Sequence, residues 1–100
     1  MSADAPSRES FERWLARIPE HEWVGEPKDC NVCPIGVFLS ALGHTAVSVW
    51  PRYYYVDHLP SFRVEPWMSD VIGAVDDMQR NITAGRLRRR LKRKLGWRIV

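Results

Sequence analysis

Two cysteines and three histidines are the residues whose spacing could hold a metal ion. Cys30 and Cys33 are separated by two residues, which is the spacing of half a zinc site. His21 and His58 lie on expected connections, whereas His44 follows a predicted helix that carries it roughly 15 Å from Cys33 at about 1.5 Å per residue. A single pair of small, partly buried cysteines more often shapes a turn. The sequence therefore predicts no metal, with zinc on Cys30, Cys33, His21 and His58 as the alternative.

The other side chains that could support catalysis are poorly arranged for it. A helix start lowers the pKa of a thiol such as Cys33, but the polar segment before it is not the strand that a redox site of this kind needs. Ser40 lies in an apolar helix with no base at a suitable spacing. Asp76 and Asp77 are adjacent on a predicted helix and point apart. The six glycines are scattered and form no phosphate loop. We expect no enzyme and no cofactor.

The strongest charge signal is a basic run near the C-terminus. Seven cationic side chains occur within nine residues. They are Arg86, Arg88, Arg89, Arg90, Lys92, Arg93 and Lys94. Leu87, Leu91 and Leu95 recur at helical spacing, which predicts a helix over residues 84–95 with one narrow apolar face on the body. Cations are then expected over most of its surface.

The net charge of +3 conceals a sharp division along the chain. Residues 1–79 contain six basic and all twelve acidic side chains, whereas residues 80–100 contain nine basic and none acidic. A segment of one sign attracts partners of the other sign. Arginine suits bidentate contacts with phosphate or guanine, and each neutralised phosphate adds affinity through counterion release. The run therefore predicts a DNA or RNA backbone as partner, with base stacking from Trp97 or residues 53–55 if these rings are exposed.

Three other uses of the basic helix stay open. The helix could cover the acidic body of its own domain, since residues 1–79 carry a net charge of −6. It could lie on an anionic membrane, but a narrow stripe of leucines fits this poorly, so no membrane partner is expected. It could also dock on an acidic protein. The three tyrosines, for their part, are more typical of a half-buried strand face than of a stacking platform.

A short apolar helix is expected at the centre of the fold. Pro34 suits the first position of a helix, and Gly43 suits the position just past its end. The residues between them are apolar on most sides, which predicts a helix over residues 34–42 that other elements must cover. Ser7 or Ser10 is expected to cap an earlier helix.

Strands and further helices are expected after this centre. Residues 45–50 and 53–57 are rich in β-formers and predict two strands, either a hairpin or one kinked edge strand. Apolar residues at helical spacing predict a long helix over residues 66–82. Thr83 is expected to cap the final helix, and residues 97–100 to add a short terminal strand.

Short motifs between residues 20 and 78 carry a resemblance to other proteins. In chain order they are Trp23-Val24-Gly25, Cys33-Pro34-Ile35, Val47-Ser48-Val49, Leu59-Pro60 and Trp67-x3-Val71-Ile72-x2-Val75-Asp76. Together they resemble a diffuse set of small uncharacterised proteins from actinobacteria and their phages. The resemblance implies an α+β fold and a phage origin, and it implies no chemistry. This chain departs from that pattern because it ends in a basic helix rather than a mostly apolar strand.

These observations predict an α+β fold, a small single domain with three or four helices packed on a two- or three-stranded antiparallel sheet. Residues 1–6 are expected to be a flexible tail, residues 7–82 an acidic body, and residues 83–100 a basic helix and short tail of the same domain. The first residues lack the pattern of an export signal, which predicts a cytoplasmic protein. The predicted function is a non-enzymatic nucleic-acid-binding module, and the alternative is a small phage-type effector that binds and inhibits a host protein.

Overall fold

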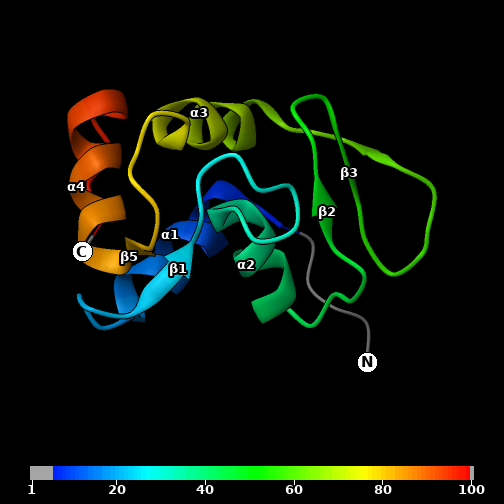
Figure 1. The fold of residues 1–100 in the computed structure, drawn as a ribbon, viewed down its shortest axis with the longest axis horizontal. Helices are drawn as coiled ribbons and strands as arrows, with labels where there is room; N and C mark the ends of the chain where they lie inside the picture. Colours follow the sequence, from blue (N-terminus) through cyan, green and yellow to red (C-terminus); the bar gives the residue numbers. More distant parts are fainter. Residues whose placement is uncertain (1–5, 100) are drawn as a thin grey trace.

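The computed structural model describes residues 6–99, and residues 1–5 of the expected N-terminal tail lie outside this range. It contains four helices and two small antiparallel sheets, so the predicted α+β fold is confirmed (Figure 1). The elements are α1 (Arg8–Arg17), β1 (Trp23–Gly25), α2 (Pro34–Ala41), β2 (Ser48–Val49), β3 (Tyr53–Tyr55), β4 (Phe62–Arg63), α3 (Pro66–Val75), β5 (Ile82–Thr83) and α4 (Ala84–Leu95). None of the helices in the described range is long and apolar enough to cross a membrane.

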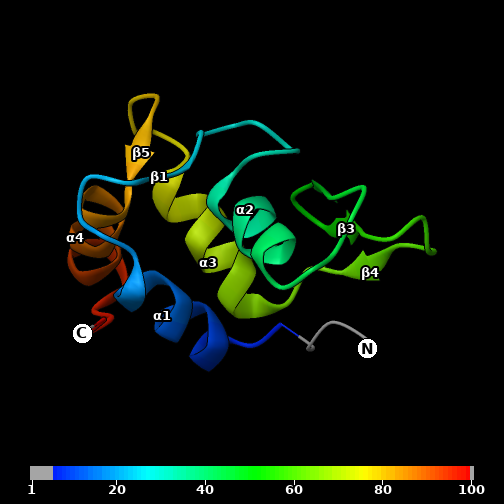
Figure 2. The same ribbon diagram turned by 90° about the horizontal axis from the view of Figure 1, so that it is seen from below.

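Helix α2 lies at the centre of the molecule, as its apolar sequence predicts (Figure 2). It begins at Pro34, and the Sγ atom of Cys33 accepts a hydrogen bond from the backbone N–H of Gly36 at 3.4 Å. Ile35 and Phe38 have no exposed surface. Burial of such side chains supplies most of the favourable free energy of folding. The buried face of α2 therefore holds α1, α3 and β2 around a common core.

Aromatic rings join α1 to this centre. The ring of Phe11 on α1 packs edge-on against Phe38, with the ring centroids 5.2 Å apart. Trp14 and Trp67 lie within 6 Å of the Phe11 ring as well, at 5.6 Å and 5.5 Å. Ser7 caps α1, because its hydroxyl accepts from the backbone N–H of Ser10 and the Ser10 hydroxyl accepts from the backbone N–H of Ser7. Both serines expected as alternative caps therefore act together.

The predicted helix over residues 66–82 is too long, because α3 ends at Val75. The chain then turns, and Asn81 adopts a left-handed backbone with φ of 61°. The carboxylate of Glu26 accepts from the backbone N–H of Asn81 at 3.0 Å, which holds this turn against the end of β1. Ile82 is fully buried, but it belongs to β5 and pairs with β1. Its apolar character thus reflects burial in a strand rather than continuation of the helix.

Strands β2, β3 and β4 form the second sheet, in that order, with antiparallel neighbours. The backbone N–H of Trp50 bonds to the carbonyl of Tyr53 at 2.9 Å, so residues 50–53 make a hairpin turn. The hairpin is therefore the correct alternative for the two predicted strands. Ser48 pairs with Tyr55, and Val49 pairs with Tyr54.

Helix α4 has the predicted boundaries. The hydroxyl of Thr83 accepts from the backbone N–H of Arg86 at 3.4 Å, and Gly96 ends the helix with a φ of 71°. The expected terminal strand is wrong for residues 97–99, which form no strand, and Val100 lies outside the described residues. Trp97 instead packs into the core, with the guanidinium of Arg8 4.2 Å from its ring centroid.

The molecule has two distinct ends. Its longest dimension is 34 Å, and Figure 1 places α4 at one end of this axis and the sheet of β2 and β3 near the other. Figure 2 shows β4 beside β3 at the same outer end. The basic helix and the three-stranded sheet therefore face different parts of the solvent.

Candidate nucleic-acid interface

The seven cations predicted to form the interface all lie on α4. Leu87 and Leu91 are fully buried and fix one face of the helix on the body. The cations occupy the remaining directions, but they differ in what they contact. Some are bound to the body of the molecule, and others face solvent.

Two of these arginines bind backbone carbonyls. Nη1 of Arg88 donates to the carbonyls of Leu15 at 2.8 Å and Ile18 at 2.9 Å, which lie at the C-terminal end of α1. A cation is favourable there, because the last carbonyls of a helix carry partial negative charge. Nη1 of Arg86 donates to the carbonyl of Asn81 at 3.0 Å, in the turn before β5. Both arginines therefore help to hold α4 in place.

Two more arginines pair with carboxylates of the body. Nη1 of Arg89 lies 3.0 Å from Glu20, and both side chains are more than half exposed. Nη1 of Arg90 lies 3.0 Å from Asp77, and the Arg90 side chain is only 16% exposed. Exposed pairs of this kind contribute about 0–1 kcal/mol. Arg89 can therefore exchange Glu20 for another anion at little cost.

The last three cations, Lys92, Arg93 and Lys94, are exposed. Within residues 6–99 they have no ion-pair partner. The final turn of α4 therefore carries three charges that are not neutralised by the described part of the chain.

Four of the arginines line a shallow depression between α4 and Met78, which follows α3. Its volume is about 210 Å³, and it is lined by Met78, Arg86, Arg89, Arg90 and Arg93. The arginines are spaced three, four and seven residues from the first, so they share one face of the helix. In the part of the chain that the structure describes, only the Glu20 and Asp77 carboxylates pair with this group of four guanidiniums. The depression, which we call the arginine depression, is therefore a positively charged site suited to a phosphate or another oxyanion.

The aromatic residues that might stack on bases are divided between the core and the surface. Trp97 is 4% exposed and Tyr54 is 7% exposed, so neither can present a ring face to a base. Tyr53 and Tyr55 are 48% and 43% exposed. The two exposed tyrosines lie on β3, far from α4 (Figure 1). Base stacking beside the basic helix therefore has no support from these residues.

The described structure does not assemble a metal site from the cysteines and histidines. Residues 6–99 contain no group of three or more His, Cys, Asp and Glu side chains that could hold a metal ion. His21 and His58 are both exposed. Burial raises the pKa of the Cys33 thiol, which outweighs the lowering by the backbone N–H of Gly36. Cys33 is therefore a neutral helix cap near pH 7 rather than an activated thiolate.

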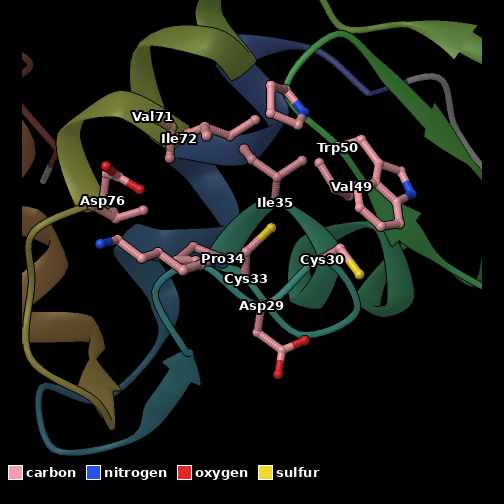
Figure 3. A pocket seen from close by; sticks show the side chains of 13 residues that line it. Asp29, Cys30, Cys33, Pro34, Ile35, Val49, Trp50, Val71, Ile72 and Asp76 are labelled. Atoms are coloured by element: carbon pink, nitrogen blue, oxygen red, sulfur yellow. The ribbon is translucent and has the colours of Figure 1, made fainter.

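An apolar cavity that the sequence analysis missed lies between α2, α3 and β2. It has a volume of about 310 Å³. Figure 3 shows Ile35 near its centre, with Val71 and Ile72 on one side and Val49 and Trp50 on the other. Since its walls come from three different elements, no local pattern could reveal it.

Glu26 is another residue whose importance the sequence did not suggest. Its carboxylate accepts hydrogen bonds from the indole N–H of Trp23 and the backbone N–H of Asn81, and Nε of Arg80 lies 3.4 Å away. The Trp23 and Asn81 hydrogen bonds and the Arg80 charge lower its pKa. Glu26 therefore fixes the turn that leads into β5 and α4, and so positions the arginine depression.

Comparison with protein-family models, with curated proteins and with solved structures finds no match to this chain.

Proposed function

We propose that this protein is a non-enzymatic module that binds the phosphate backbone of DNA or RNA through α4. The observation that supports this most directly is the arginine depression, which four arginines line and in which, within residues 6–99, two carboxylates pair with them. Guanidinium groups bind phosphate oxygens through two parallel hydrogen bonds. A phosphate that enters the depression would therefore meet several donors at once.

The exposed cations extend this site along the helix. Arg93 belongs to the arginine depression, and Lys92 and Lys94 flank it on the last turn. Arg89 has an exposed and weak partner in Glu20, so a phosphate can replace that carboxylate. Arg88 has a different part in the proposal, because its guanidinium is already bound to α1. It positions the helix, as does Arg86, which donates to the carbonyl of Asn81. Arg89, Arg93 and the flanking lysines contact the nucleic acid.

A salt titration of duplex binding tests this proposal. The slope of log K against log salt is negative, and each phosphate contact on duplex DNA contributes about 0.9 to its magnitude. We expect the double variant Arg89→Gln, Arg93→Gln to reduce this magnitude by about 1.8. Arg13→Gln with Arg17→Gln is the matched control, since it removes the same charge from exposed positions on α1. An equal change in both variants, or a native protein whose binding does not depend on salt, would contradict the proposal.

The second candidate function is a small phage-type effector that binds and inhibits a host protein. The apolar cavity beside Trp50 favours it, because anchors of protein interfaces are commonly aromatic or apolar side chains in desolvated pockets. Capture of partners from a host lysate with and without nuclease separates the two candidates. A partner that persists after nuclease treatment and is lost when Ile72→Glu places a charge in the cavity supports the effector. A partner that disappears with nuclease supports nucleic-acid binding.

A further inference from the structure

A second polar surface lies at the end of the molecule away from α4. Strand β3 points Tyr54 inward, where it stacks with Phe62 at a centroid distance of 5.4 Å. Because side chains alternate along a strand, Tyr53 and Tyr55 point to the outer face, and both are about half exposed. Figure 2 places β3 and β4 at the outer end of the fold. The sheet therefore offers two tyrosine rings to solvent.

Two arginines accompany only one of these rings. Arg63 on β4 is the cross-strand partner of Tyr53, so the two side chains lie on the same face. Arg52 precedes Tyr53 in the hairpin turn. All three side chains line a depression of about 350 Å³, together with Pro66 and Ser69 of α3. Within residues 6–99, neither arginine has an ion-pair partner.

We infer that this depression binds an unpaired nucleotide, with the base on the ring of Tyr53 and the phosphate on Arg52 and Arg63. An exposed aromatic ring accepts any base because every base has a flat π face, and guanidiniums bind the adjoining phosphate. Bases within a duplex are already stacked on one another and cannot use the ring. The inference goes beyond the proposed role of α4, which requires only the phosphate backbone.

Glu65 decides between a nucleotide and a simple anion. This carboxylate lies between Val64 and Pro66, both of which line the depression. Burial and the Glu65 charge together raise the pKa of Tyr54, so the carboxylate acts on this part of the sheet. Within residues 6–99 Glu65 forms no ion pair with either arginine, but a negative charge beside the depression weakens the attraction for any anion. An acidic peptide would rely on that attraction alone, whereas a nucleotide also gains from stacking on Tyr53.

Fluorescence anisotropy with a ten-nucleotide oligothymidylate tests the inference in an Arg89→Gln, Arg93→Gln background, which weakens binding by α4. We expect Tyr53→Leu to weaken binding roughly five- to 150-fold, the range for loss of one stacked base. Tyr55→Leu is the matched control, because Tyr55 has the same residue type, strand and face but lies opposite Ser48 rather than an arginine. It is expected to change affinity less than twofold. Thermal unfolding of each variant checks that the fold is intact.

Further variants separate the base from the phosphate. Arg63→Gln is expected to lower the salt slope by about 0.7, the value for one phosphate contact on a single strand. Glu65→Gln is expected to raise the affinity. The Glu65 side chain makes no capping hydrogen bond to α3, so the substitution removes the charge without removing a helix cap. An oligomer with abasic sites has no base to stack on Tyr53, so the protein with Tyr53 intact and the Tyr53→Leu variant should bind this oligomer equally weakly. Thymidine monophosphate that binds as tightly as the oligomer identifies a free nucleotide as the ligand, and weaker binding identifies a strand.

Several results would overturn the inference. These are an unchanged affinity for Tyr53→Leu, an abasic oligomer that binds as well as the complete one, and displacement of the oligomer by polyglutamate at equal charge concentration. If the duplex titration shows no effect of the α4 variants, the measurements on the sheet are unaffected. The two proposals can therefore fail separately.

Discussion

The basic helix and the three-stranded sheet differ in how their cations relate to the rest of the molecule. Helix α4 carries seven cations, but four of them bind carbonyls or carboxylates of the body. The sheet carries only Arg52 and Arg63 beside Tyr53, and within the described residues neither forms an ion pair. The density of charge in a sequence is therefore a poor measure of the charge available to a partner. What matters is which acceptors the fold brings to each side chain.

The first prediction concerns how firmly the two ends are attached to the core. Leu91→Ala removes a fully buried side chain of α4 and is expected to lower the free energy of unfolding by about 2–5 kcal/mol. Tyr55→Ala, on the exposed face of the sheet, is expected to change it by less than about 0.5 kcal/mol. Urea denaturation measures both. If the leucine variant were as stable as the native protein, α4 would be an appendage rather than part of the domain.

The second prediction divides the cations of α4 by their contacts. Arg88→Ala removes the donor to the carbonyls of Leu15 and Ile18 and is expected to cost about 1.5–3 kcal/mol, the range for hydrogen bonds to charged groups. Lys92→Ala is the matched control on the neighbouring turn, and it should leave the stability nearly unchanged. Urea denaturation again gives the free energies.

Duplex affinity completes the test of this division. We expect Lys92→Ala to reduce duplex affinity at low salt, since Lys92 is exposed and within the described chain forms no ion pair. If Lys92→Ala lowered the free energy of unfolding as much as Arg88→Ala, the hydrogen bonds of Arg88 to α1 would not explain its contribution to stability.

The sequence predicted α4 well because its signals are local. Thr83 and Gly96 mark the two ends, and the leucines mark the buried face. The contacts of Arg88 could not be predicted, because its acceptors lie about 70 residues away at the end of α1. A helical pattern predicts which face of a helix is buried, but it does not say which polar groups of another element will lie beside the remaining faces.

The error in α3 has the same origin. Met78 and Ile82 continue the apolar spacing of the helix and are indeed buried. The helix nevertheless stops at Val75, and Glu26 holds the following turn from a position 55 residues earlier in the chain. Burial and helical structure produce similar apolar spacing over a short segment, so the pattern alone could not distinguish them. The apolar cavity beside Ile35 and the depression at Tyr53 also depend on how several elements pack together, which no single periodic pattern shows.

The last and smallest predicted effect lies near the base of the sheet and depends on pH. The carboxylate of Asp57 accepts from the backbone N–H of Thr45 at 2.7 Å and lies 2.7 Å from Nδ1 of His44. The Thr45 N–H, followed by His44, lowers the pKa of Asp57 from its usual 3.8. These contacts join the chain before β2 to the chain after β3. We expect Asp57→Asn to lower the melting temperature at pH 7, with Asp70→Asn, an exposed position on α3, as the control.

The sign of the pH dependence follows from the lowered pKa. Because the folded protein binds the proton of Asp57 less tightly than the unfolded chain does, its stabilising contribution is complete above pH 3.8 and is lost as the pH falls through the lowered pKa of the folded state. The difference in melting temperature between the native protein and Asp57→Asn should therefore shrink as the pH falls below 3.8. Comparing the two proteins at each pH cancels the titration of other carboxylates, including Glu26. If the difference in melting temperature persisted unchanged at pH 2, the effect of Asp57→Asn would not come from loss of the carboxylate charge. The base of the sheet would then depend on neutral hydrogen bonds, unlike the charged contacts that hold α4.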